Sequence, residues 1–273
     1  MKLLFLGDVM GKAGRDTVAD RLPSLIEEYS FDFVVINGEN ASHGRGLTEG
    51  HFQNLMDAGA DVVTLGDHAF DQRETLSYIE REQTLVRPIN FMEGTPGRGA
   101  TLMTGRNGHQ VLVVNALGRV FMNPMGDPFG AVETAISDCP LSAMADAIVV
   151  DFHAEATSEM QAMGHFLDGR VSLVVGTHTH IPTSDHRILE GGTALMSDAG
   201  MCGDFNSVIG MEADEPVNRF TTGLVTGRFT PATGAATLCG VAIETDPKTG
   251  LCISVSPVRI GGSLSQALPG FQN

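Results

Sequence analysis

Residues 146–180 read "DAIVVDFHAEATSEMQAMGHFLDGRVSLVVGTHTH", and this stretch decides the fold. Two apolar runs, each of the length of a buried strand, flank a segment that has the length and composition of a helix. A strand, a helix and a second strand form the unit from which parallel sheets are built. The first run ends near His153, and the second ends at His178 and His180. The stretch therefore predicts an α/β fold in which polar side chains follow buried strands.

The same alternation extends over most of the chain that precedes it. Strands are expected at 2–8, 31–40, 61–68, near 86–91 and at 109–118, and helices at 14–30, 47–60, 73–81 and 129–136. Pro23 disturbs the first of these helices, and Thr48 is a plausible N-cap of the second. After residue 192 the pattern changes to alternating apolar and polar residues at 193–198, 219–230, 235–246 and 251–260, which favours antiparallel strands. Without a linker or repeat, we expect one domain over residues 1–273 that holds two packed sheets.

Composition excludes several classes of protein. The chain has 273 residues, of which 42% are hydrophobic, and its formal net charge of −16 comes without a Lys/Arg-rich block. Binding to long nucleic acid is therefore not expected, since it needs clustered cations. No apolar run approaches the roughly 20 residues that span a bilayer, and the N-terminal apolar run is too short for a signal peptide. We expect a cytoplasmic protein with four reduced cysteines, because these are scattered along the chain.

Polar, metal-capable residues follow five of the predicted strands. They are Asp8, Glu39 with Asn40, Asp67 with His68, His153, and His178 with His180. In extended chain His178 and His180 point the same way, although a lone pair at this spacing is more often two exposed loop histidines. Because ligands of α/β sheets bind outside the carboxyl ends of the strands, all five sets are expected at one edge. The sequence predicts a metal site there.

The donor types narrow the choice of metal. Oxygen and imidazole donors without thiolate suit Mn, Fe or Zn in a catalytic role better than structural zinc. Seven donors, counted without His68, are too many for one ion. A dinuclear centre, with a carboxylate bridging ions about 3.5–4 Å apart, uses them all and can act on a phosphoryl group.

At these residues the chain resembles the calcineurin-like metallophosphoesterases, in the form of the YmdB-like bacterial phosphodiesterases. Similar stretches cover nearly the whole sequence: "RDTVADRLP" (15–23), "NGENASHGRGLTE" (37–49), "TLVRPINFMEGTPGRG" (84–99), "DPFGA" (127–131), "DFHAEATSE" (151–159) and "GTHTHIPTSDHRIL" (176–189). The resemblance implies a four-layer α/β/β/α sandwich of two mixed sheets and a centre of two metal ions, Fe or Mn before Zn. It also implies hydrolysis of small phosphodiesters, with 2′,3′-cyclic nucleotides as the substrate class.

The resemblance also implies a role for each candidate residue. Asp8, Asn40 and His180 would hold one ion, Asp67, His153 and His178 the other, and Glu39 would bridge them. A metal-bound hydroxide would attack phosphorus, and His68 would protonate the leaving oxygen, unless it only orients a ligand. Asp67 stands where the family usually has Asn. Its extra negative charge is expected to favour metal and to make the activity profile more alkaline, unless Asp67 turns away to cap the following helix.

Other readings stay open at this point. A phosphomonoesterase or 5′-nucleotidase would use the same residues, because substrate choice lies in the loops. A regulatory protein that binds a nucleotide or an RNA end without turnover is a rival of another class, although pure binding needs no proton donor at His68. Arg15 is a candidate contact for a substrate phosphate. The oligomeric state is open, a homo-oligomer included, and no membrane partner is expected.

Overall fold

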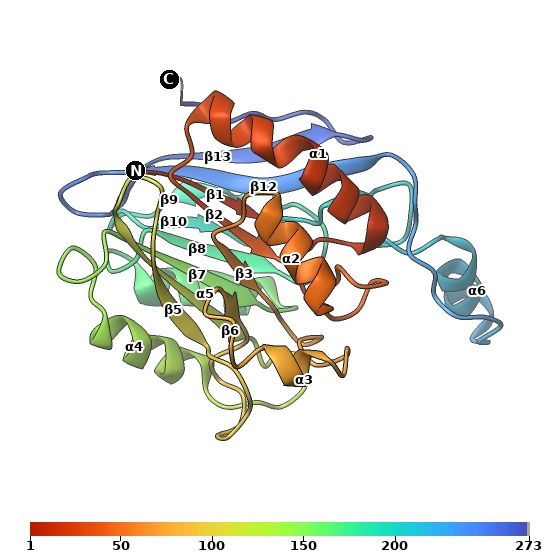
Figure 1. Cartoon of the computed structure of the whole chain (residues 1–273). Helices are drawn as coiled ribbons and strands as arrows, with labels where there is room; N and C mark the ends of the chain where they lie inside the picture. Colours follow the sequence, from red (N-terminus) through yellow and green to blue (C-terminus); the bar gives the residue numbers. More distant parts are fainter. Residues whose placement is uncertain (272–273) are drawn as a thin grey trace.

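The computed structural model describes residues 1–271, so the last two residues of the expected 1–273 domain lie outside it. The chain forms two mixed β-sheets flanked by helices (Figure 1). The first sheet has the order β11-β12-β1-β2-β3-β4, with β13 paired to β12, and the second has the order β5-β6-β7-β8-β10-β9.

The strands of the first sheet are β1 (Lys2–Leu6), β2 (Phe33–Asn37), β3 (Val62–Thr64), β4 (Leu85–Val86), β11 (Gly203–Asp204), β12 (Ala236–Thr245) and β13 (Cys252–Gly261). Those of the second are β5 (Ala100–Thr104), β6 (Gln110–Leu117), β7 (Ala147–His153), β8 (Leu173–Thr177), β9 (Arg187–Ile188) and β10 (Ala194–Met196). The helices are α1 (Gly11–Tyr29), α2 (Glu49–Asp57), α3 (Thr75–Tyr78), α4 (Pro128–Asp138), α5 (Thr157–Leu167) and α6 (Asp214–Thr222).

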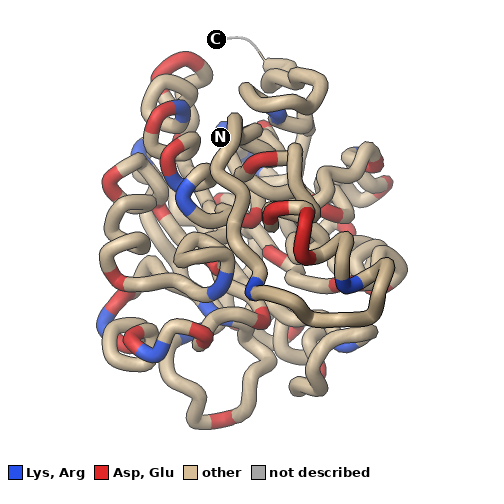
Figure 2. The backbone as a smooth tube through the Cα atoms, turned by 90° about the vertical axis from the view of Figure 1, so that its right-hand side faces the viewer, with Lys and Arg blue, Asp and Glu red and all other residues tan. Residues whose placement is uncertain are grey.

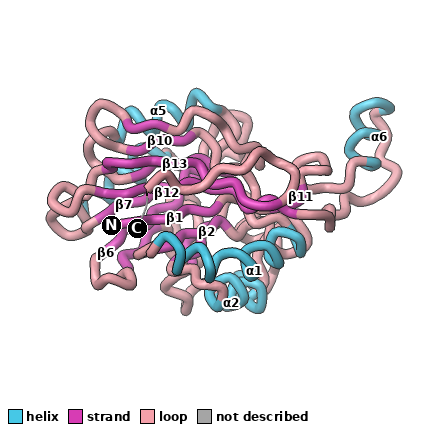
Figure 3. The backbone as a smooth tube through the Cα atoms, turned by 90° about the horizontal axis from the view of Figure 1, so that it is seen from above, coloured by secondary structure: helices cyan, strands magenta, loops and turns pink. Residues whose placement is uncertain are grey.

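Alternation along the buried strands divides the core into three layers. In β1, Leu3 and Phe5 pack into the space between the two sheets, whereas Leu4 and Leu6 pack under α1 and α2. The second sheet repeats this pattern and buries its other face against α4 and α5. Seen from above, α1 and α2 lie on one side of the strands and α5 on the other (Figure 3). The predicted four-layer α/β/β/α sandwich is confirmed.

Parallel pairing brings the strand ends to one edge of each sheet. β1 pairs in parallel with β2, and β2 with β3, while β7 pairs in parallel with β6 and β8. Thr48 caps α2 as expected, since its hydroxyl accepts a hydrogen bond from the backbone N–H of His51. The parallel pairing in both sheets directs the loops after β1, β2, β3, β7 and β8 toward a common site.

One predicted strand is wrong. Residues 219–230 form the end of α6 and an exposed loop, because Gly223 ends the helix in a left-handed conformation and the alternating apolar side chains face solvent. Together with the preceding residues they build an arm, residues 212–231, that projects from the body (Figures 1 and 3). The 193–198 strand is the short β10, which pairs in parallel with β8 and antiparallel with β9. Antiparallel pairing is confirmed for β12 and β13.

The expectations from composition can be followed on the structure. In the view of Figure 2, Lys and Arg positions are scattered among Asp and Glu. The four cysteines are free thiols, and all four are buried in the structure. Among the helices of residues 1–271, none combines the length and the apolar character that a bilayer crossing requires.

Candidate metal centre

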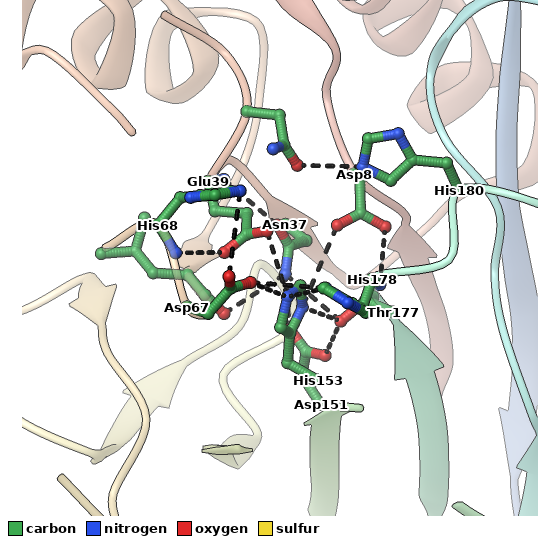
Figure 4. A network of polar contacts seen from close by, with 12 residues as sticks. Asp8, Asn37, Glu39, Asp67, His68, Asp151, His153, Thr177, His178 and His180 are labelled. Carbon is green, nitrogen blue, oxygen red and sulfur yellow. Dashed lines mark hydrogen bonds and ion pairs between the residues drawn. The ribbon is translucent and has the colours of Figure 1, made fainter. Parts of the chain in front are cut away.

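Every residue predicted for the site lies where strand ends from both sheets meet (Figure 4). Asp8 follows β1, Glu39 and Asn40 follow β2, Asp67 and His68 follow β3, His153 ends β7, and His178 and His180 follow β8. Most of them are buried, whereas Asp67, His68 and His178 are partly exposed. The convergence arises from topology, because residues more than 100 positions apart in the chain meet through the two sheets.

Four of these side chains present acceptor atoms to one small volume. One ligand atom each from Glu39, Asp67, His153 and His178 lies within 4.8 Å of the other three. His153 Nε2 is 3.1 Å from Glu39 Oε1, 3.0 Å from Asp67 Oδ1 and 3.0 Å from His178 Nδ1. This cluster can hold a metal ion.

The other ring nitrogens show which atoms face inward. His153 Nδ1 donates to Thr177 Oγ1 at 2.8 Å, because the Thr177 hydroxyl itself donates to the Asp151 carboxylate. His178 Nε2 lies 3.3 Å from Glu155 Oε2. Both imidazoles thus have an outer partner that fixes their orientation, which is the usual arrangement of histidine ligands. Nε2 of His153 and Nδ1 of His178 are therefore left to face the Glu39 and Asp67 carboxylates, and a metal ion could lie among these atoms.

His180 Nε2 and Asn40 Oδ1 form a second pair of atoms that could bind a metal ion. His180 Nδ1 donates to the carbonyl of Ile209 at 2.8 Å, and burial lowers the pKa of His180, so its Nε2 carries a lone pair. This atom lies 3.3 Å from Asn40 Oδ1, whose orientation is set because Asn40 Nδ2 donates to the carbonyl of Gly44. Two acceptors at this distance cannot bond to each other. They fit a shared cation.

Asp8 adds a buried charge that lacks a full set of partners. Its Oδ2 accepts from the backbone N–H of His178, but Oδ1 has no hydrogen-bond partner among residues 1–271. Burial raises the pKa of Asp8 to about 7. Burial alone would lower the pKa of His153, but the Glu39 and Asp67 carboxylates outweigh it and raise this pKa well above its usual value. Crowded, buried carboxylates thus favour bound protons at this site, and a metal cation could take the place of those protons.

The two histidines of "GTHTH" face the site for a different reason from the one predicted. β8 ends at Thr177, and His178 and His180 have φ values of 107° and 67°. They are therefore not on one face of an extended strand. Positive φ is costly for residues other than glycine and clusters at functional sites, so a strained turn delivers each imidazole separately.

His68 lies beside the cluster rather than within its four-residue core. Its backbone N–H donates to Glu39 Oε2, and its Nδ1 lies 3.0 Å from Asp71 Oδ2. Its Nε2 is 3.8 Å from Asp67 Oδ2. The alternative in which Asp67 caps a helix is wrong, because Glu74 occupies the N-cap of α3 and Asp67 turns inward.

Three carboxylates that orient residues of the site were not predicted from the sequence: Asp71, Asp151 and Glu155. Asp151 is fully buried and accepts from Thr64 Oγ1 at 2.5 Å, Thr177 Oγ1 at 2.7 Å and Asn37 Nδ2 at 3.1 Å. A signal for it existed, since Asp151 interrupts an apolar run two residues before His153 and so shares its face of β7.

Replacing Asp151 by Ala is expected to weaken metal binding by about 10–100-fold, the range for residues that orient ligands. The change removes the acceptor that holds Thr177, and Thr177 in turn holds His153 Nδ1. Metal affinity measured by competition with a chromophoric chelator checks this. Asp146→Ala, at an exposed carboxylate, is the matched control. Equal affinities of the two variants would contradict the orienting role.

The cluster opens into a cavity of about 480 Å³. Glu39, Asn40, His68, His178 and His180 line it, together with apolar residues from the segment that carries the arm. Arg15 does not line it, because its guanidinium is half-buried and donates to the carbonyl of Ala41. Among the described residues around the cavity, Arg45 is the one Lys or Arg, and its guanidinium has no hydrogen bond or ion pair within residues 1–271. Arg45, not Arg15, is therefore placed to meet an anionic ligand.

Comparison with known proteins gives consistent results. A family model of YmdB-like proteins matches residues 4–258. The chain is 45% identical over 260 residues to a 2′,3′-cyclic-nucleotide 2′-phosphodiesterase of Bacillus subtilis, covering 95% of this chain and 97% of that protein. It is also similar to the crystal structure of a hypothetical protein from Thermus thermophilus, with a TM-score of 0.89, 39% identity and coverage of 96% and 100%. The structure of a novel phosphatase from Mycoplasma pneumoniae gives a TM-score of 0.88 at 35% identity, with coverage of 96% and 93%.

Proposed function

Because the chain belongs to the YmdB-like protein family, we propose that it hydrolyses nucleoside 2′,3′-cyclic phosphates at a centre of two metal ions. The relatives are a phosphodiesterase and a phosphatase, and the protein is a hydrolytic phosphoesterase. The observation that carries the proposal is the convergence of carboxylate and imidazole ligand atoms from Glu39, Asp67, His153 and His178 on one small volume.

Two groups of ligands support a count of two ions. Asp67, His153 and His178 would hold one ion, and Asp8, Asn40 and His180 the other, with Glu39 shared between them. Iron or manganese suits this set of oxygen and nitrogen donors best, and zinc is the alternative. When bound, the ions would supply Lewis acidity that neutralises the phosphate and activates the attacking water.

Side chains of the protein would hold the proton donor in place and supply the proton. Hydrolysis adds water across one P–O bond of the cyclic ester, and cleavage of the bond to O2′ leaves a nucleoside 3′-phosphate. The departing O2′ needs a proton, and His68 at the rim of the cluster would deliver it from Nε2. Asp71 accepts from Nδ1 and so fixes the ring and balances the charge of the imidazolium.

A hydrolysis panel on protein of known metal content tests this function. Purified protein, loaded with Mn or Fe and analysed for metal per chain, is offered 2′,3′-cyclic AMP, bis(p-nitrophenyl) phosphate, p-nitrophenyl phosphate and 5′-AMP. We expect turnover of the diesters, with 3′-AMP as the product from the cyclic nucleotide. Preference for the monoesters would favour a phosphomonoesterase or 5′-nucleotidase. Cyclic nucleotide that stays bound for hours unchanged would show a binding protein without turnover.

Arg45 is expected to attract the substrate phosphate. Replacing it by Ala should raise KM for 2′,3′-cyclic AMP by roughly tenfold, which corresponds to one charge-assisted hydrogen bond. Arg45 is exposed, and its guanidinium makes no hydrogen bond or ion pair with the described part of the chain, so its removal should cost little stability. Steady-state kinetics at two salt concentrations check this, with Lys248→Ala in the β12–β13 turn as a control for net charge. An equal change of KM in both variants would contradict a direct contact.

A further inference from the structure

The arm, residues 212–231, keeps its shape through polar contacts of its own. Glu215 accepts hydrogen bonds from Arg219 Nε at 2.7 Å and from Thr226 Oγ1 at 2.7 Å. These bonds lower the pKa of Glu215 to about 2, with Thr226 as the larger cause and Arg219 next. Asn218 Nδ2 donates to the carbonyl of Leu224, which closes the loop back onto α6. The arm is therefore an ordered hairpin although it projects from the body (Figure 3).

Apolar side chains cover this hairpin where a stable surface element would carry polar ones. Phe220 is 88% exposed, Val225 71% and Leu224 64%. Such residues add little to the core, and apolar surface that is held in place usually marks a binding site. Two of the arm's aromatic residues, Phe220 and Phe229, line the same cavity as His68, His178 and His180. Phe220 and Phe229 are therefore placed to contact a ligand that occupies the cavity beside the metal-binding residues.

The lining of the cavity combines two chemically different sets of residues. One set consists of the metal-binding residues and His68, and the other consists of six apolar residues, Val208, Ile209, Met211, Pro216, Phe220 and Phe229. The two sets meet at Ile209, whose carbonyl accepts a hydrogen bond from His180 Nδ1. A ligand that fills the cavity must therefore combine a phosphate group with a flat or apolar group. A nucleotide has this division, with its phosphate at one end and its base at the other.

We propose that Phe220 and Phe229 form a stacking wall for the nucleobase of the substrate. This inference rests on the proposed function and names the part of the substrate that the arm recognises. The Arg219 guanidinium lies 3.9 Å from the centre of the Phe229 ring, and Glu215 holds that guanidinium in turn. The Phe229 ring is thus fixed before substrate binds, which reduces the entropy lost on binding.

An apolar wall also determines whether the enzyme can distinguish one nucleobase from another. Every face of a nucleobase can stack on an aromatic ring, whereas discrimination between bases needs donors and acceptors at their edges. The six apolar residues of the lining offer no side-chain donor or acceptor. The enzyme should therefore require a base without selecting which one.

The test compares substrates with and without a base. Wild-type protein, Phe220→Ala and the matched control Leu224→Ala are loaded with Mn and assayed on 2′,3′-cyclic AMP and on glycerol 1,2-cyclic phosphate. Leu224 is exposed on the same arm but does not line the cavity. We expect Phe220→Ala to lower the ratio of kcat/KM for the nucleotide over the base-free ester by about tenfold, and Leu224→Ala to leave the ratio unchanged.

Equilibrium binding separates this inference from the proposed function. The Kd of adenosine 3′-monophosphate, relative to that of inorganic phosphate, should rise about tenfold in Phe220→Ala by calorimetry. Unchanged ratios in Phe220→Ala, or an equal change in Leu224→Ala, would overturn the stacking wall. If the wild-type protein hydrolysed neither cyclic phosphate, the proposed function would fail, while the ratio of Kd values would still decide whether the arm binds the base.

Discussion

Replacing His68 by Gln is expected to lower kcat by roughly 10²–10⁴-fold, the range for loss of a general acid, with metal content near that of the wild type. His68 lines the cavity, and Asp71 holds its Nδ1, so Nε2 is the atom that would deliver the proton in the proposed reaction. Gln keeps a hydrogen-bonding group of similar size but cannot donate a proton to an alkoxide. Rates measured on a substrate with a nitrophenolate leaving group should fall much less, because that oxygen leaves without protonation.

Metal analysis distinguishes this role from its alternative. The backbone N–H of His68 donates to Glu39 Oε2, and that contact persists in the variant. His165→Gln, at an exposed position of α5, controls for the loss of a histidine as such. Loss of an ion from His68→Gln would make His68 a ligand. A uniform loss of rate on good and poor leaving groups would make it a positioning residue.

Replacing Gly66 by Ala is expected to lower kcat/KM by at least about 10²-fold, because small displacements of catalytic groups have effects of this size. A Cβ at this position would lie 2.5 Å from the His153 ring and would overlap Glu39 Oε2. Both side chains are buried, so neither can move aside without leaving the cluster. Activity and metal content should therefore fall together.

Gly50→Ala is the matched control for this substitution. Gly50 lies in α2, and a Cβ there would meet nothing within 4 Å. Alanine favours a helix over glycine by about 1 kcal/mol, so this variant should be at least as stable as the wild type and fully active. Thermal unfolding of both variants shows whether the fold survives. A fully active Gly66→Ala protein would contradict the assignment of Glu39 and His153 to the reactive centre.

The four layers were implied by the family resemblance, whereas the two packed sheets and the meeting of strand ends were predicted from the residues, because they follow from local rules. Alternation in "KLLFL" sends Leu3 and Phe5 to one core layer and Leu4 and Leu6 to the next, whatever the details of the loops. Likewise, a polar residue directly after a parallel strand lies at the carboxyl edge of the sheet. The second rule placed all eight predicted site residues at the edge where the strands end, although His178 and His180 turn inward for another reason.

The incorrect predictions concern contacts that cannot be derived from the pattern of neighbouring residues in the sequence. The pattern at 219–230 alternates like a strand, but nothing in it shows that no sheet lies beside it to bury its apolar side chains. The inward turn of His178 depends on a positive φ, and sequence offers no glycine there as a signal. Arg15 was the predicted phosphate contact, but its guanidinium donates to the Ala41 carbonyl, whereas Arg45 lines the cavity.

Anomalous diffraction from crystals soaked in Mn²⁺ tests the central claim most directly. We expect two anomalous peaks roughly 3.5–4 Å apart, as in other two-metal sites, with Glu39 between them. One peak should lie among Asp67, His153 and His178, and the other among Asp8, Asn40 and His180. A single peak, or two peaks away from these side chains at saturating Mn²⁺, would contradict the dinuclear centre.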